Sequence, residues 1–112
     1  GLVGLFRMQY HGRGELADRQ DIIEQILIKF RNLAIYSNVC VILTNQVMSN
    51  PDPFGNPIRP VGGNIVAHTS TYRIWLRKGS KSKRIAKMDD SPMHDQIEVV
   101  WESNVKGCAD PE

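Results

Sequence analysis

The stretch that decides the predicted fold is Val39-Cys40-Val41-Ile42-Leu43, followed at once by Thr44-Asn45-Gln46. Its apolar residues do not alternate with polar ones and include β-branched side chains, which is typical of a strand covered on both faces in a parallel sheet. A segment rich in Pro, Gly and Asn follows. Ligands of α/β proteins bind where buried strands end and open into loops. The sequence therefore predicts a ligand site at this junction.

A long amphipathic helix is predicted upstream of this strand, over about residues 16–36. Its apolar residues recur three or four apart, which is the period of a helix with one buried face. A helix that leads into a buried strand is half of an α/β layer, so the predicted fold class is α/β, with mostly parallel strands flanked by this helix. The apolar positions are Ile22, Ile23, Ile26, Leu27, Phe30, Leu33 and Ala34.

The second half of the chain predicts further strands, over residues 71–102. Residues 71–77 alternate between apolar and polar side chains, and residues 83–88 return after the turn Gly79-Ser80-Lys81-Ser82. This pattern predicts an antiparallel hairpin, with residues 96–101 as a third strand. Residues 47–60 hold four prolines, one glycine and two asparagines, so we expect no regular element there.

The net charge of +2 conceals separate charge blocks. Residues 53–88 carry eight Lys or Arg and no acidic residue, whereas residues 89–112 carry seven acidic residues and one lysine. A basic block indicates either a surface for a polyanion or an edge hairpin protected against aggregation.

Other residue patterns exclude whole classes of protein. The chain has no apolar run near 18 residues and no signal peptide, so we expect no membrane span and an intracellular protein. Cys40 is predicted to be a buried free thiol in the strand, and Cys108 is too distant in sequence to make a CxxC pair with it. Three scattered histidines do not predict a metal site.

Three groups of residues are candidates for phosphate chemistry. Gln46 lies at the end of the predicted strand, where its amide either orients a phosphate or only satisfies loop backbone. Arg7, Arg13 and Arg19 recur six residues apart and either follow successive phosphates or are solvated. Gly62-Gly63, near Arg59, allows a close approach of the backbone to a ligand, although most such pairs mark only a turn.

Several of these motifs occur in one succession: Gly12-Arg13-Gly14-Glu15-Leu16, then Pro60-Val61-Gly62-Gly63-Asn64, then Leu76-Arg77-Lys78-Gly79. This succession resembles the DNA strand-exchange recombinases of the archaeal RadA type, in the RecA superfamily. The resemblance is specific from Leu5 to Met88 and weaker beyond Asp95. It implies the C-terminal half of a RecA-like ATPase core, with the first DNA-binding loop region in residues 1–20 and the second in residues 47–64.

The resemblance also implies roles for single residues. Gln46 is then the catalytic residue that couples the γ-phosphate of ATP to the second loop, and His68 senses the nucleotide. Asp90, Ser91 and Pro92 cap the ATP of a neighbouring subunit, although Asp95 replaces a proline usual in the family and leaves the shape of this cap open. The residues expected along DNA are Arg7, Arg13, Arg19, Arg59, Gly62, Gly63 and Asn64.

By the same resemblance, the parent protein forms a homo-oligomeric filament on single-stranded DNA with ATP and magnesium. It pairs that strand with homologous double-stranded DNA and exchanges strands in recombinational repair. The chain contains no GxxxxGK[ST] loop and no strand that ends in a magnesium-associated Asp. We therefore expect ATP and Mg to be held mainly by an N-terminal half outside this chain and by the neighbouring subunit.

Two interpretations of this gap stay open. The chain is a partial sequence or one half of a split gene, which we favour, or it is a truncated protein that binds DNA without ATP turnover. In a related alternative, the chain is a non-catalytic DNA-binding module or recombinase regulator that uses the basic hairpin of residues 73–87.

The purified chain is predicted not to hydrolyse ATP, because no segment of it can cradle the β- and γ-phosphates. Phosphate release, measured with and without single-stranded DNA, should equal the rate in buffer. DNA-dependent turnover by a monodisperse sample would contradict this expectation.

Overall fold

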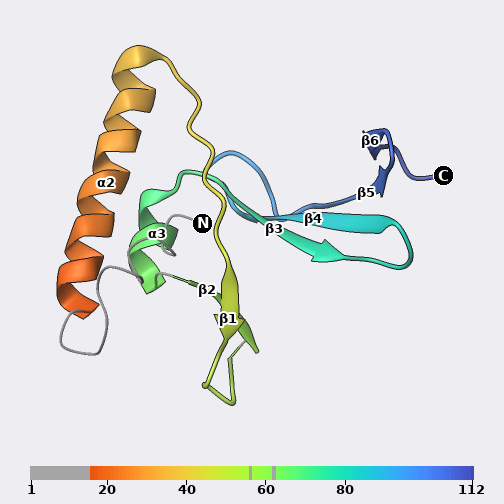
Figure 1. Cartoon of the computed structure of the whole chain (residues 1–112), viewed down its shortest axis with the longest axis horizontal. Helices are drawn as coiled ribbons and strands as arrows, with labels where there is room; N and C mark the ends of the chain where they lie inside the picture. The colour runs from red at the N-terminus through yellow and green to blue at the C-terminus, as the bar shows by residue number, and fades with distance from the viewer. Residues whose placement is uncertain (1–15, 56, 62) are drawn as a thin grey trace. The chain divides into compact units, whose positions relative to one another are not determined.

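The structure is a computed structural model that describes residues 16–55, 57–61 and 63–112 (Figure 1). The chain divides into two compact units, Gly1–Thr69 and Ser70–Glu112. The first unit holds α2, a two-stranded sheet of β1 and β2, and the short helix α3. The second unit is a four-stranded sheet, in the order β3-β4-β5-β6.

Helix α2 (Leu16–Ser37) confirms the helix that the apolar period predicts. It ends in a Schellman motif: Asn38 has a φ of 52°, and the N–H of Val39 donates to the carbonyl of Ala34 at 3.4 Å. Asparagine tolerates this left-handed conformation better than most residues with a side chain. The signal Ser37-Asn38 therefore ends the helix by a backbone reversal.

The predicted parallel sheet is wrong for the residues that the structure describes. All of their strand pairings are antiparallel. Residues 39–43 are neither helix nor strand, because none of the described residues pairs with them. As a result Ile42 is 83% exposed, and Cys40, predicted to be buried, is exposed.

The expectation of no regular element in residues 47–60 is also wrong. Strands β1 (Val47–Ser49) and β2 (Ile58–Pro60) form a short antiparallel hairpin, in which Met48 lies opposite Arg59. A proline is tolerated at the end of an edge strand, and Pro60 occupies such a position. The prolines between the strands lie in the connecting loop, where they cost no ladder hydrogen bond.

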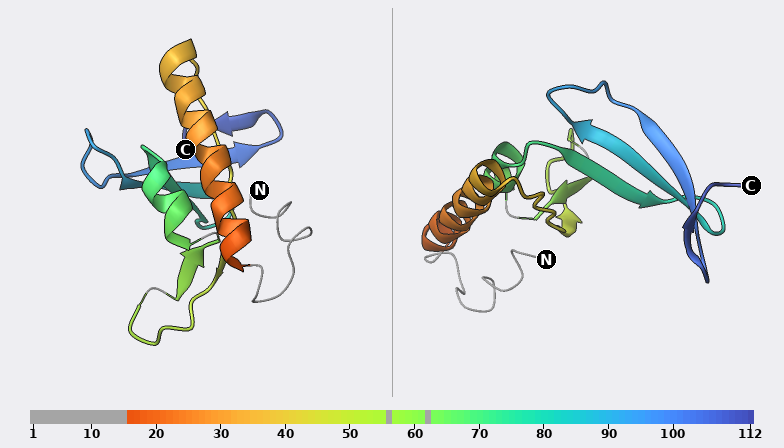
Figure 2. Two further views of the ribbon diagram at one scale, coloured as in Figure 1. Left: turned by 90° about the vertical axis from the view of Figure 1, so that its left-hand side faces the viewer. Right: turned by 90° about the horizontal axis from the view of Figure 1, so that it is seen from above.

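The core of the first unit lies where α2 meets the hairpin and α3 (Gly63–Thr69). Ile23 and Leu27, four residues apart on one face of α2, are buried together with Val61. Met48, Ile65 and Val66 pack around them and are partly buried. Helix α3 lies beside α2 in Figures 1 and 2, in agreement with the contacts between them.

The sheet of the second unit is a chain of antiparallel neighbours, which Figure 2 shows as a twisted ribbon. The hairpin of β3 (Arg73–Lys78) and β4 (Lys83–Asp90) confirms the predicted one, and β5 (Glu98–Asn104) and β6 (Gly107–Ala109) extend it. Residues 79–82 and 105–106 form short turns, and residues 91–97 connect β4 to β5. Connections of this length fit antiparallel neighbours, because parallel strands need a crossover of a dozen or more residues. In the β3–β4 turn the N–H of Lys83 donates to the carbonyl of Ser80 at 3.0 Å.

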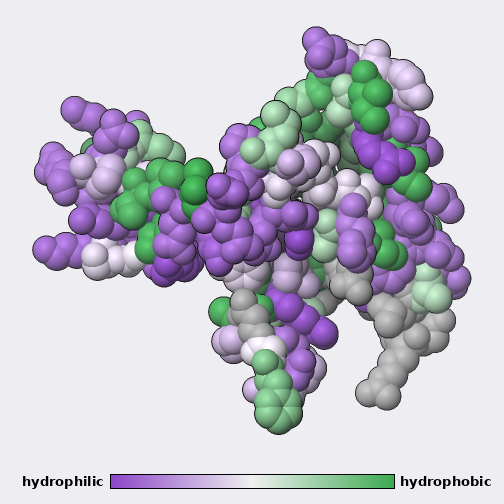
Figure 3. All heavy atoms as spheres, turned by 180° about the vertical axis from the view of Figure 1, so that it is seen from behind, coloured by the Kyte–Doolittle hydropathy of each residue, from purple (hydrophilic) through white to green (hydrophobic). Residues whose placement is uncertain are grey.

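One face of this sheet is apolar and exposed. The register places Ile74 opposite Met88, and Leu76 opposite Ala86, which in turn lies opposite Val99. Leu76 is 65% exposed and Val99 is 55% exposed. Figure 3 shows apolar surface on the sheet and at the tip of the β1–β2 hairpin.

Replacing Leu27 by alanine should lower the free energy of unfolding of the first unit by about 2–3 kcal/mol, because the change leaves a cavity against Ile23 and Val61. The matched control is Leu33→Ala on the same helix, where Leu33 is 47% exposed and the loss should stay below about 1 kcal/mol. Urea unfolding followed by helical circular dichroism measures both losses. Equal losses would show that the core does not lie on this face.

Candidate nucleic-acid interface

The base of the β1–β2 hairpin is closed at Val61. The N–H of Val61 donates to the carbonyl of Gln46 at 2.8 Å, and the Nδ2 of Asn45 donates to the carbonyl of Val61 at 2.7 Å. The N–H and the carbonyl of Val61 are therefore both hydrogen-bonded, to the consecutive residues Gln46 and Asn45. Since the side chain of Val61 is also buried on α2, the end of the hairpin is fixed to the helix.

The tip of the hairpin is shaped by its own polar side chains. The Oδ1 of Asn50 accepts the N–H of Asp52 at 3.2 Å, and the Oδ1 of Asp52 accepts the N–H of Phe54 at 3.0 Å. The N–H of Gly55 donates to the carbonyl of Asp52 at 3.3 Å. These local bonds are turns of the Asx type, and they present Phe54 with 96% of its surface exposed.

The candidate residues of the second loop surround this base. Gln46 is exposed, with its backbone bonded to Val61, and Arg59 is exposed on β2. Gly63 is the first residue of α3 and His68 lies exposed in its last turn, roughly 7.5 Å further along the axis at the rise of an α-helix. The backbone of Asn64 lies in α3; Gly62 falls outside the described residues.

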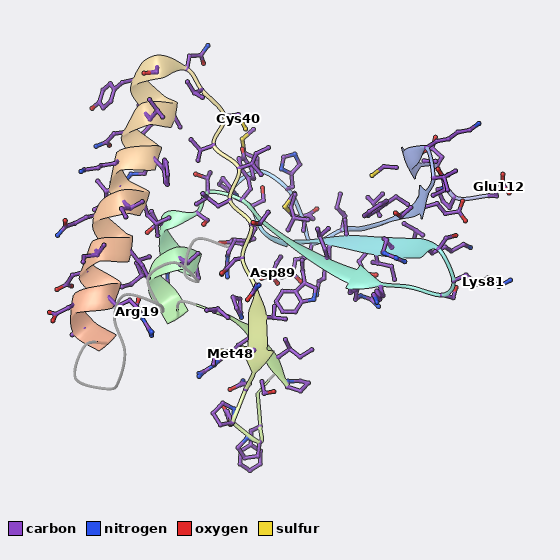
Figure 4. All side chains as sticks on the ribbon, in the orientation of Figure 1. Arg19, Cys40, Met48, Lys81, Asp89 and Glu112 are labelled. Atoms are coloured by element: carbon purple, nitrogen blue, oxygen red, sulfur yellow. The ribbon has the colours of Figure 1, made fainter. Side chains whose placement is uncertain are left out.

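Of the arginines expected in the first loop region, Arg7 and Arg13 lie outside the described residues, and Arg19 lies on the first turns of α2 (Figure 4). Arg19 precedes Ile23 by one helical repeat, so it continues the buried face. Its Nε and the Oε1 of Gln20 are buried atoms without a hydrogen-bond partner in the part of the chain that the structure describes. A buried donor without an acceptor is costly, so this position favours a polar ligand or neighbour.

The predicted nucleotide cap begins at a β-bulge. Arg73 lies opposite Asp90 and Ile74 lies opposite Met88, which leaves Asp89 as an extra residue. Figure 4 shows Asp89 on this strand. The bulge lets two consecutive carboxylates reach one guanidinium, with Arg73 Nη2 to Asp90 at 3.3 Å and Nη1 to Asp89 at 3.8 Å. The carboxylate of Asp90 is therefore already paired.

The turn after Asp90 is closed by Ser91. Its Oγ accepts the N–H of Met93 at 3.2 Å and the N–H of His94 at 3.1 Å, and it lies 2.9 Å from the Nδ1 of His94. The hydroxyl of Tyr72 donates to the Sδ of Met93 at 3.7 Å. His94 was not predicted from the sequence as part of a site, although the spacing Ser-x-x-His was an available signal. Pro92 lies exposed inside this turn.

Acidic residues of β5 compensate much of the basic hairpin. Lys83 lies opposite Glu102 and Lys87 opposite Glu98, and Arg77 pairs with Glu98 at 3.2 Å. The two charge blocks of the sequence therefore interleave across the strands. The side chain of Lys81 points outward from the tip of the hairpin in Figure 4. Its backbone φ is 54°, in the left-handed region.

Comparison with known proteins decides the family. The Rad51 family profile matches residues 1–111. The chain belongs to the Rad51 family. It is 51% identical over 111 residues to the DNA repair and recombination protein RadA of Cenarchaeum symbiosum (strain A). The match covers 98% of this chain and 28% of that relative, so the chain spans less than a third of the relative's length.

The printed name of that relative describes a protein of DNA repair and recombination. Among the described residues, no group of three or more His, Cys, Asp or Glu side chains could hold a metal ion, and Asp90 is paired with Arg73. Within the described ranges, no helix combines the length and apolarity that crossing a bilayer requires.

Replacing Asn45 by alanine should loosen the base of the hairpin, because it removes the donor to the carbonyl of Val61. The loss is about 1 kcal/mol, which corresponds to roughly fivefold faster hydrogen exchange of the Val61 N–H. Thr44→Ala, a change at the exposed neighbour, is the control and should leave this exchange rate unchanged. If both variants exchange alike, the amide of Asn45 does not hold the hairpin.

Proposed function

We propose that residues 47–64 of this Rad51-family chain are a DNA-contacting segment of a recombinase. The hairpin exposes Arg59 and places the Gly63 backbone at the start of a helix, so both a charge and backbone amides are available to phosphates. Arg19, whose side chain is half-buried on α2, adds a guanidinium. The full set of proposed DNA contacts is Arg7, Arg13, Arg19, Arg59, Gly62, Gly63 and Asn64.

The observation that carries this proposal is the joint at Val61. Gln46 accepts one hydrogen bond from Val61 through its carbonyl and Asn45 donates another to Val61, so a displacement of these two residues would be passed on to the end of the hairpin. A segment that responds to nucleotide and also holds DNA needs such a connection. We propose Gln46 as the catalytic and coupling residue, with His68 as a second sensor.

The remaining parts of the proposal concern the whole protein. Asp90, Ser91 and Pro92 contact nucleotide held by a neighbouring subunit, with ATP and Mg bound outside the residues described. The assembly is a filament inside the cell that binds single-stranded DNA, pairs it with double-stranded DNA and exchanges strands. Family membership supports these steps, and Asp90 is paired with Arg73 at 3.3 Å.

Binding of the full chain to a fluorescent oligo-dT tests the DNA contact. Arg59→Ala should weaken binding and reduce the slope of log affinity against log salt by about 0.7, the value for one lost phosphate contact on a single strand. Lys106→Ala, in the exposed β5–β6 turn, is the charge-matched control and should leave the slope unchanged.

The alternative function, a DNA-binding module based on the basic hairpin, predicts a different pattern. Lys81 extends from the tip of that hairpin, so Lys81→Ala should then lower the affinity while Arg59→Ala does not. The acidic partners of Lys83, Lys87 and Arg77 speak against this alternative, because they reduce the potential of the hairpin. Loss of affinity in Lys81→Ala alone would replace the proposed function with this one.

A further inference from the structure

The turn after Asp90 has a hydroxyl at which three polar groups meet. A serine hydroxyl offers one proton and two lone pairs. The N–H groups of Met93 and His94 both donate to the Oγ of Ser91, so they occupy its lone pairs. Its own proton is then left for the Nδ1 of His94, 2.9 Å away. This count assigns the ring as a neutral imidazole that carries its hydrogen on Nε2.

Protonation of His94 would change that arrangement. An imidazolium has an N–H at Nδ1, so three donors would converge on an oxygen that has only two lone pairs. The ring N–H would then compete with the backbone N–H groups of Met93 and His94 for the Oγ of Ser91. Since these two backbone bonds close the turn, the competition would weaken the bonds that give the turn its shape.

The aromatic and charged groups near the turn belong to its own segment and to the neighbouring strands. Tyr72, before β3, lies with its ring centroid 6.2 Å from that of His94, and Arg73 on β3 is engaged by Asp89 and Asp90 of β4. Asp95 follows His94 directly, and Glu98 of β5 is paired with Arg77. A carboxylate attracts an imidazolium, and three of these four carboxylates already have an arginine partner.

We propose that the turn 91–94 is a proton-sensitive latch, closed when His94 is neutral and opened when it is protonated. The ion pair of Asp90 with Arg73 holds the residue before this turn, and the hydroxyl of Tyr72 holds Met93 inside it. Opening of the turn would therefore change the path of the chain between Asp90 and β5. The effect on nucleotide contact rests on the proposed function, because Asp90, Ser91 and Pro92 are the proposed contacts. The latch itself needs neither nucleotide nor DNA.

Hydrogen exchange in the full chain tests the latch. The protection factors of the Met93 and His94 amides, corrected for intrinsic exchange, should fall about fivefold from pH 8 to pH 5, the range in which histidine changes charge. The internal control is the N–H of Lys106, which donates to the Oδ1 of Asn104 at 2.8 Å in a turn without histidine. Its protection should not change.

Two variants separate the latch from a general loss of structure. His94→Gln keeps a neutral side chain at every pH, so the amides of residues 93 and 94 should show protection that does not depend on pH. Ser91→Ala removes the shared acceptor, so the same amides should be unprotected at both pH values.

The tautomer of His94 is the second measurement. Ring ¹⁵N shifts at pH 8 should show the hydrogen on Nε2, and a hydrogen on Nδ1 would overturn the proposal. The proposal also fails if protection stays constant while the ring titrates, or if His94→Gln keeps the pH dependence. Because Arg59→Ala reports on DNA at constant pH, failure of the proposed function would be seen separately.

Discussion

The burial of Val61 against α2 is the interaction on which the first unit depends. Its side chain contacts Ile23 and Leu27, while its N–H and carbonyl are bound by Gln46 and Asn45. Val61 thus closes the β1–β2 hairpin, lies two residues before α3 and packs in the core, so it connects three pieces of local structure. The proposed DNA-contacting segment is therefore anchored at its base, even though most of its side chains are exposed.

The sequence predicted local structure well and non-local pairing poorly. The period of α2 and the alternation in β3 are properties of short windows, and both were confirmed. An apolar run such as residues 39–43 indicates that burial against a neighbouring strand or helix is favourable, but it does not identify that neighbour. For this reason the prediction of a parallel sheet was wrong. The number of prolines in residues 47–60 led to the wrong expectation that no strand forms there. Their effect depends on their positions, which are in the connecting loop and at a strand end.

The bonds of the candidate site depend on non-local pairing in the same way. Gln46 was named from its place at the end of an apolar run, and its role stays a prediction, whereas the bond of Asn45 reaches a residue 16 positions away. The interleaving of Lys83 with Glu102 and of Lys87 with Glu98 depends on strand register, which composition does not contain. The basic block of residues 53–88 and the acidic block of residues 89–112 thus contribute neighbouring side chains to one face of the sheet. They do not form two separate surfaces.

The tip of the β1–β2 hairpin has a further consequence. Its turn is formed by bonds between residues no more than three positions apart, from the side chains of Asn50 and Asp52 to nearby backbone, and the N–H of Asn50 closes it by donating to the carbonyl of Pro57 at 2.8 Å. A conformation encoded so locally needs little from the surrounding protein, so residues 50–55 are a portable module. Transplanted onto an unrelated two-stranded scaffold, this short piece would carry its geometry, and its displayed phenyl ring, with it.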